Sequence, residues 1–179
     1  MSSNREITFR SAVPADIPVI QDLSASIWRE HYPGIITHAQ IDYMLENMYA
    51  APVMQDEMRK GYRYILVEQD GAPIGYISYR SEESEHAVMI SKLYLFPALH
   101  GKGMGRQMLQ YVKDDALRMG ARLIYLFVNK NNRAAIRAYE RFGFSKAEAV
   151  KTDIGGGFVM DDFRMELQLG RSSSATLHH

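Results

Sequence analysis

Residues 92–106 read KLYLFPALHGKGMGR, an apolar segment that passes through a glycine-rich turn into a helical pattern. Three glycines, Gly101, Gly103 and Gly105, stand at the start of the helix, where backbone N–H groups are unpaired and the helix dipole is positive. Glycine lets such a backbone approach a ligand closely and adopt a positive φ. The stretch therefore predicts a strand, a cradle for a pyrophosphate and a helix, with Lys102 and Arg106 adding positive charge.

Two other phosphate-binding motifs do not fit this turn. Its glycine spacing is GxGxG rather than GxGxxG, and the strand after the helix lacks the acidic residue of a dinucleotide-binding unit. The GxxxxGK[ST] pattern of a nucleoside-triphosphate loop is also missing. Taken alone, the turn is equally consistent with a glycine-rich connection that holds no ligand.

Hydrophobic spacing around the turn predicts one α/β domain over residues 5–169. We expect the order β-α-α-α-β-β-β-α-β-α-β-β, a mixed sheet flanked by helices. Strands are expected at 6–10, 64–68, 73–80, 87–95, 122–128, 145–151 and 158–169, and helices at 14–28, after Thr37, and at 52–60, 106–119 and 132–142. The polar segment 170–179 is expected to be a disordered tail.

Two of these elements carry more specific expectations. The segment 122–128, RLIYLFV, is nearly all apolar, as expected of a strand covered on both faces. The helix 106–119 is amphipathic, and its inward face is expected to consist of Met108, Leu109, Val112, Ala116 and Leu117.

Composition excludes several classes of function. The 21 Lys and Arg residues balance 21 Asp and Glu residues, which argues against bulk nucleic-acid binding. No apolar run approaches the length of a membrane span, so no membrane partner is expected. The chain has no cysteine, which excludes disulfides, thiolate metal sites and an acyl-cysteine intermediate. This absence suits a reducing cytoplasm.

Two motifs, in this order, resemble the GNAT-type N-acetyltransferase superfamily. The family has [QR]-x-x-G-x-[GA] after a strand of the type LYV-x-P, and residues 93–97 (LYLFP) followed by His100-x-x-Gly103-x-Gly105 are similar. Further on, the family pattern N-x-x-A-[IL]-x-x-[YF]-x-[KR]-x-G-F is similar to residues 132–144, NRAAIRAYERFGF. The resemblance covers residues 7–169 and implies the GNAT fold, whose mixed central sheet is mostly antiparallel.

The resemblance also implies a reaction and a set of contacts. Acetyl-CoA would be the co-substrate, without a metal, and its acetyl group would pass directly to an amine. Tyr139 would stand beside the sulfur and donate a proton to the departing thiolate. Without the motif, its place one turn after Ile136 would favour a core aromatic instead. The implied cofactor contacts are Leu93, Tyr94, Leu95, His100, Gly101, Lys102, Gly103, Met104, Gly105, Arg106, Asn132 and Ala135.

The chain departs from the family pattern at two points. His100 stands where the family has Gln or Arg, which affects one side-chain contact and leaves the backbone cradle intact. Members that use a carboxylate base often carry Glu on the strand before the LYV triplet, where this chain has Met89, Ser91 and Lys92. The general base is therefore open, and the candidates are Glu30, His31, His86, Asp161 and Asp162.

The acceptor end is expected around residues 28–34, WREHYPG, because this region lines the acceptor pocket in the family. Trp28, His31 and Tyr32 are candidate substrate contacts, and Asp161 and Asp162 could attract a cationic amine. A hydrophobic cluster at a helix end and a solvated turn are the alternatives. Together with the late glycine turn, this loop is similar to bacterial polyamine-type acetyltransferases.

The sequence thus leaves four functions open. We favour acetylation of a small-molecule amine, with polyamines first among the acceptors. A protein acetyltransferase that acts on an N-terminal amine or a lysine, a non-catalytic acetyl-CoA-binding module and a plain structural domain are the alternatives. Family members are often dimers, so a homodimer is a further expectation from the resemblance.

Overall fold

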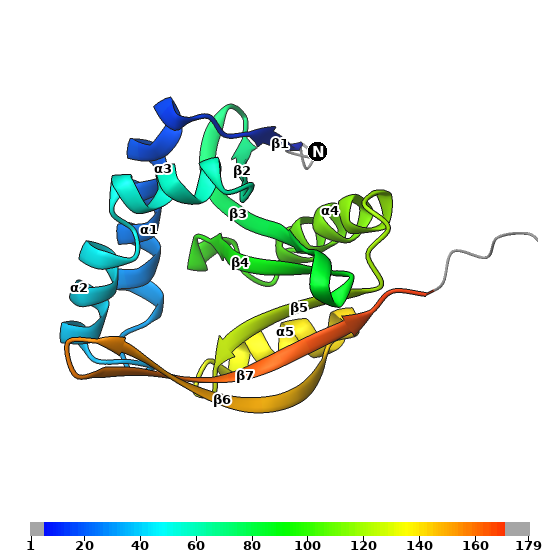
Figure 1. Cartoon of the computed structure of the whole chain (residues 1–179). Coiled ribbons are helices and arrows are strands. Elements are labelled where there is room, and N and C mark those ends of the chain that lie inside the picture. The colour runs from blue at the N-terminus through cyan, green and yellow to red at the C-terminus, as the bar shows by residue number, and fades with distance from the viewer. Residues whose placement is uncertain (1–5, 171–179) are drawn as a thin grey trace, which may run out of the picture.

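The computed structural model describes residues 6–170, so the predicted tail lies outside them apart from Gly170. Within this part of the chain, seven strands form one sheet in the order β1-β2-β3-β4-β5-β7-β6 (Figure 1). The strands are β1 (Ile7–Ser11), β2 (Arg63–Gln69), β3 (Ala72–Glu82), β4 (Ala87–Leu95), β5 (Leu123–Asn129), β6 (Ser145–Gly155) and β7 (Phe158–Gln168).

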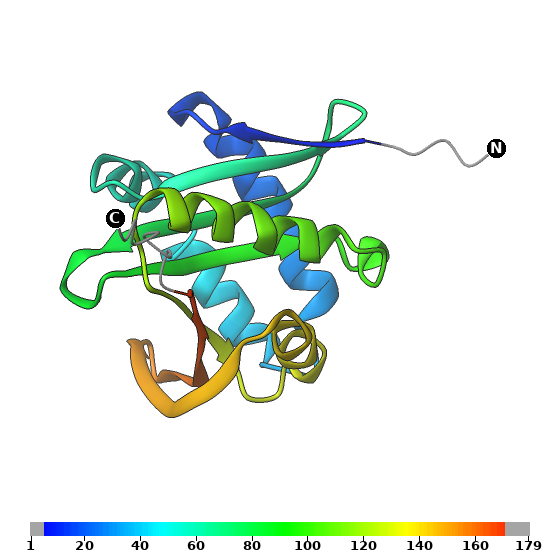
Figure 2. The same cartoon turned by 90° about the vertical axis from the view of Figure 1, so that its right-hand side faces the viewer.

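Among the described residues, five α-helices flank this sheet. They are α1 (Ile17–His31), α2 (His38–Asn47), α3 (Ala51–Arg59), α4 (Met104–Arg118) and α5 (Arg133–Phe142). Helices α1, α2 and α3 lie on one side of the sheet, and α4 and α5 lie on the other (Figures 1 and 2). The observed order and the mixed, mostly antiparallel sheet confirm the predicted fold class.

One pair of strands is parallel. Strands β4 and β5 are the parallel pair. Parallel neighbours need a long connection that carries the chain back to the starting edge, and α4 provides it. The two strands pair only from Ala87–Leu123 to Ile90–Leu126, and beyond this point the ladder ends. Strand β4 continues to pair with β3 and strand β5 with β7, so the sheet splits into two halves.

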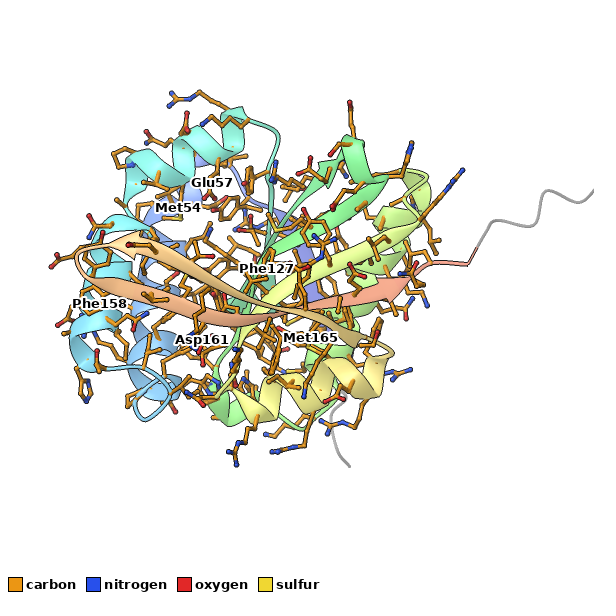
Figure 3. All side chains as sticks on the ribbon, turned by 60° about the horizontal axis from the view of Figure 1, so that its bottom comes forward. Met54, Glu57, Phe127, Phe158, Asp161 and Met165 are labelled. Atoms are coloured by element: carbon orange, nitrogen blue, oxygen red, sulfur yellow. The ribbon has the colours of Figure 1, made fainter. Side chains whose placement is uncertain are left out.

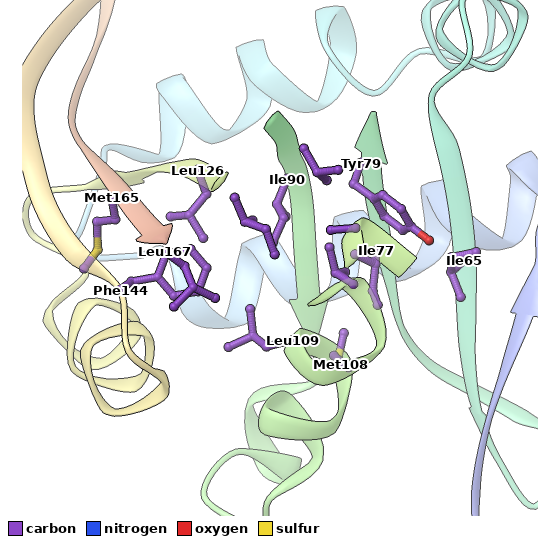
Figure 4. Packing of buried hydrophobic residues seen from close by; sticks show 14 of the residues in the cluster. Ile65, Ile77, Tyr79, Ile90, Met108, Leu109, Leu126, Phe144, Met165 and Leu167 are labelled. Carbon is purple, nitrogen blue, oxygen red and sulfur yellow. The ribbon is translucent and has the colours of Figure 1, made fainter. Parts of the chain in front are cut away.

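Two hydrophobic cores hold the helices to the sheet. Between the sheet and helices α4 and α5, Met108 and Leu109 project from α4 toward strand residues such as Ile77 and Ile90 (Figure 4). On the other side, the predicted stripe of α1 is buried as expected and consists of Ile17, Ile20, Leu23 and Ile27. Both cores reach the line where the sheet splits, the first through Ile90 and Leu126 and the second through Tyr94.

Two expectations about burial were wrong. Leu117 is 46% exposed, because it lies at the flank of α4 while Met108, Val112 and Ala116 occupy the face against the sheet. Phe127 is 43% exposed, although strand β5 was expected to be covered on both faces. Beyond Leu126 the neighbouring strand β4 has diverged, and one face of β5 borders an opening.

Several element boundaries also differ from the predicted ones. Helix α4 begins at Met104, two residues before the predicted start, and β6 extends to Gly155 rather than residue 151. The predicted cap of the second helix is confirmed, because the Thr37 hydroxyl accepts a hydrogen bond from the Gln40 N–H at 3.1 Å. Among residues 6–170, none of the helices combines the length and the apolar character needed to span a bilayer.

Candidate active site

A cavity of about 940 Å³ opens where β4 and β5 separate. Its walls come from α1, α2, α3, the free end of β4, β5, the start of α4, one face of α5 and β7. Most of the predicted site residues line it, namely Trp28, His31, Tyr32, Leu93, Tyr94, Leu95, His100, Gly101, Gly103, Gly105, Arg106, Asn132, Ala135, Tyr139 and Asp162. Of the predicted cofactor and substrate contacts, three do not line it: Lys102, Met104 and Asp161.

The glycine turn forms an open cradle at one end of the cavity. Gly101 and Gly103 have positive φ values of 77° and 82°, which only glycine adopts without strain. A Cβ added at Gly101, Gly103 or Gly105 would meet no atom within 4 Å, so the backbone borders open space there. The first intrahelical bond of α4 joins Gln107 N–H to the Gly103 carbonyl, which leaves the preceding N–H groups free. This arrangement fits a diphosphate group.

The free edge of β4 forms a second wall. From Ser91 to Leu95 the strand has lost β5 as a neighbour, while its other edge still pairs with β3. The register between β3 and β4 shifts at Ser91, a bulge that bends the strand at the point of separation. Such an edge can pair with an extended ligand by backbone hydrogen bonds. His100 closes the edge, with its Nε2 3.0 Å from the Leu95 carbonyl oxygen.

Helix α5 supplies two of the predicted residues. Asn132 caps the helix, and its Oδ1 accepts from the Ala135 N–H and lies 3.3 Å from His31 Nε2. Tyr139, about two turns further along, lines the cavity, and burial raises its pKa to about 12. Among residues 6–170 the Tyr139 hydroxyl has no hydrogen-bond partner. A neutral phenol with a free O–H is therefore available to a ligand.

The two adjacent carboxylates lie in different environments, because successive side chains of a strand point to opposite faces. Asp162 is 5% exposed, faces the cavity from β7 and stands opposite Asn129 of β5. Burial, aided by the charge of Asp161, raises the pKa of Asp162 to about 6. Asp161 points away and binds Lys130 at 2.8 Å, and this hydrogen bond lowers its pKa. The predicted pair of carboxylates therefore does not face the cavity as a pair.

The remaining base candidates separate in the same way. His31 lines the cavity, and burial lowers its pKa, so the imidazole is neutral at pH 7. Glu30 is exposed on the outer face of α1 and does not line the cavity. His86 occupies a tight turn with a φ of 50° and is also absent from the lining.

Aromatic side chains form another part of the cavity wall. The Trp28 and Tyr32 rings stack with centroids 4.0 Å apart. Tyr49 and Tyr94 meet Trp28 edge-on at 5.5 and 5.6 Å, and their hydroxyls share a hydrogen bond of 2.9 Å. The predicted acceptor segment 28–34 therefore contributes to a packed aromatic wall of the cavity.

Sequence reasoning missed a buried ion pair in the lining. Lys92 Nζ of β4 lies 3.2 Å from Glu57 Oε2 of α3, and both residues border the cavity. Glu57 follows the buried Met54 by three residues, and both project from α3 toward the strands (Figure 3). That spacing was a usable signal, because residues three apart share a helix face.

Comparisons with known proteins agree with this architecture. The model of the acetyltransferase (GNAT) family matches residues 21–144. The L-methionine sulfoximine/L-methionine sulfone acetyltransferase of Salmonella typhimurium is 31% identical over 61% of this chain and 66% of its own length. The L-amino acid N-acyltransferase MnaT of Escherichia coli is 27% identical over 61% of this chain and 66% of its own length. The matches thus span less than two thirds of either relative.

A solved structure supports the fold. The PaiA N-acetyltransferase of Thermoplasma acidophilum, in complex with coenzyme A, superposes with a TM-score of 0.79 at 20% identity, covering 92% of this chain and 99% of that one. The two halves of the sheet, the glycine turn and the family match over more than half of the sequence lead to one assignment. This chain belongs to the GNAT family of acetyltransferases.

Proposed function

We propose that this protein transfers the acetyl group of acetyl-CoA to the primary amine of a small molecule. The observation that carries the proposal is one continuous cavity with a glycine cradle at one end and a buried carboxylate, a free phenol and an aromatic wall elsewhere in its lining. The names of the two curated relatives support an acetyl or acyl transfer to amino-acid-type acceptors.

The residues present fit acetyl-CoA, which supplies an activated thioester when bound. The N–H groups at the start of α4 would hold its diphosphate, and Arg106 at the cavity wall would add charge. The edge of β4 from Ser91 to Leu95 would pair with the pantetheine arm. One backbone N–H of that edge, directed at the carbonyl oxygen, would contribute about 3 kcal/mol of transition-state stabilisation.

Asp162 is the proposed general base. An alkylamine is mostly protonated near neutral pH, so a proton must leave before its nitrogen attacks. A buried carboxyl with a pKa of about 6 is ionised at pH 7 and basic enough to accept that proton. His31 is a second possible base, because its imidazole is neutral at this pH. Its Nε2, however, already contacts Asn132 Oδ1. Asp162 is therefore the better candidate.

Tyr139 is the proposed general acid. As the new N–C bond forms and the C–S bond breaks, the sulfur leaves as a thiolate that needs a proton. The Tyr139 phenol remains protonated throughout the neutral range, and its O–H has no competing partner within the described chain. The ammonium acceptor gives its first proton to Asp162 before attack, and Asp162 passes this proton to solvent. As the tetrahedral intermediate collapses, the nitrogen loses its second proton and Tyr139 gives its phenol proton to the departing sulfur. The second nitrogen proton restores the phenol through solvent, so the net result is one amide, one thiol and one proton released.

The enclosed aromatic wall favours a small acceptor over a protein. Trp28 and Tyr32 stack tightly, and such a wall accommodates a compact substrate better than a folded surface. The expected preference for polyamines stays a prediction. A polyamine carries several positive charges, and two carboxylates line the cavity, Glu57 and Asp162. Lys92 already neutralises Glu57, so only Asp162 would be left to bind a second ammonium group.

The test is the release of free thiol from acetyl-CoA across a panel of spermidine, amino acids and peptides, alongside the thermal shift caused by acetyl-CoA. We expect a clear shift and thiol release with at least one small amine. A shift without transfer to any amine would indicate a binding module. No shift at all would remove the cofactor assignment as well.

A further inference from the structure

Lys92 is the one lysine among the described residues that line the cavity, and it is buried. Its side chain is 8% exposed, and its Nζ lies between the Glu57 carboxylate and the rings of Tyr49 and Tyr64, at 5.4 and 5.7 Å from their centroids. The group lines the cavity together with Glu57 and Tyr49. Lys92 is therefore a charged group of the site itself rather than of the outer surface.

The hydrogen bonds of this cluster leave a donor unused. The Glu57 carboxylate accepts hydrogen bonds from both Lys92 and the Tyr64 hydroxyl, so both of its oxygens have donors within the protein. The Lys92 ammonium has three N–H groups, and within residues 6–170 its hydrogen bonds go to Glu57 alone. What the pair offers to a ligand in the cavity is a positively charged donor, which suits an oxyanion.

Fold stability does not account for this pair. Burying two charges costs desolvation energy that their attraction barely offsets, and apolar side chains of similar size would hold the same position at least as well. Around the pair the lining is apolar or aromatic, including Met44, Met48 and Trp28. In such surroundings a charge–charge contact to a ligand is stronger than in water, which gives the lysine a large effect on selectivity.

We infer that Lys92 is a specificity residue that binds a carboxylate on the acceptor, so the acceptor is an amino acid or a similar amine that carries an oxyanion. The inference rests on the proposed function, because it assigns the acceptor of that same site. Lys92 and Tyr94 are two residues apart on one face of β4, about 7 Å along the strand. Asp162 borders the same cavity from β7, so a compact zwitterion can present its amine and its carboxylate to different walls.

The test compares matched acceptors that differ by the carboxylate alone: methionine against 3-(methylthio)propylamine, and phenylalanine against phenethylamine. For the wild type we expect kcat/KM to be about 10- to 100-fold higher for the amino acid of each pair, the range of a hydrogen bond to a charged group. Lys92→Met should remove most of this preference through KM, with little change for the two plain amines. Lys60→Met is the matched control, because Lys60 pairs with Asp56 on the outer face of α3. This variant should change neither the preference for amino acids nor the kcat/KM for the plain amines.

Lys92→Met leaves Glu57 buried without its cation, so the double variant Lys92→Met/Glu57→Gln serves if the single variant does not fold. Equal rates of the wild type on both members of each pair, or an equal loss for both in the variant, would overturn the inference. If no amine releases thiol, the proposed function fails, and binding still decides the inference. In the presence of coenzyme A, methionine and phenylalanine should then raise the Tm of the wild type but not of the Lys92 variants, and no shift in the wild type would refute it.

Discussion

Ile90 of β4 and Leu126 of β5 form the last rung at which these two parallel strands pair. Both side chains are buried in the core beneath α4 and α5, so the point of separation is anchored. One residue further, the bulge at Ser91 bends β4 and the face of β5 at Phe127 becomes exposed. The cavity and the free strand edge both depend on this single divergence.

Replacing Tyr139 by Phe removes a proton donor and little else. We expect kcat for acetyl transfer to fall about 100-fold, the lower end of the range for general acid catalysis, while the thermal shift caused by acetyl-CoA is kept. Steady-state thiol release measures the first and differential scanning fluorimetry the second. Tyr111→Phe on α4, whose ring stacks on Phe9 away from the cavity, is the control. An unchanged kcat in Tyr139→Phe would exclude the acid role.

The proposed base predicts the acidic limb of the pH profile. Asp162 has a pKa of about 6, so kcat/KM should decline as the pH falls through this value and the carboxyl takes up its proton. Asp162→Asn should lower kcat/KM about 100-fold at pH 8 and abolish this limb. Asp161→Asn, whose side chain contacts Lys130 outside the cavity, should keep the limb. The same limb in Asp162→Asn would assign the base to another group.

The same carboxyl predicts a gain in stability on mutation. Its pKa is raised in the folded protein, so the native state binds the proton more tightly than the unfolded chain does. The free energy of unfolding therefore falls as the pH rises from about 4 to about 6, and the loss persists above that range. At pH 7.5 we expect Asp162→Asn to be about 1 kcal/mol more stable than the wild type, after allowance for solvent screening. Near pH 3.5 the difference should vanish in urea unfolding curves.

The cradle predicts a variant that folds but does not bind. Gly105 lies in α4 without a positive φ, and a Cβ there meets no atom within 4 Å, so the Cβ of Gly105→Leu has open space in the free protein. Its side chain would fill the space where the diphosphate is expected. The Tm of the free protein should be unchanged or slightly higher, because glycine is a poor helix former, and the shift caused by acetyl-CoA should disappear. Gln107→Leu, exposed on the same helix, should retain that shift; a retained shift in Gly105→Leu would contradict the cradle.

The corrected face of α4 predicts two different losses of stability on one helix. Met108 is fully buried, and Met108→Ala should lower the free energy of unfolding by about 2–5 kcal/mol through the cavity it leaves. Leu117 is 46% exposed, and Leu117→Ala should change it by less than about 0.5 kcal/mol. Chemical denaturation of the two variants measures both values. A large loss in Leu117→Ala would return this residue to the inward face.

Local features of the sequence were enough for the elements and the turn. Glycine at Gly101 and Gly103, the cap at Thr37 and the apolar stripe of α1 are properties of a few neighbouring residues. Such preferences depend on residues within one or two turns of the chain, so they can be predicted from the sequence without knowledge of the tertiary structure. They determined the order of the strands and helices and the position of the proposed diphosphate cradle.

The tertiary structure decided which charged groups share the cavity. It separated Asp161 from Asp162, joined Lys92 to Glu57 across 35 residues of sequence and exposed Phe127. Each outcome depends on where β4 and β5 part and which face of each strand then borders the gap. That point is determined by the packing of both cores, and a pairing that ends through long-range packing leaves no mark in the local sequence.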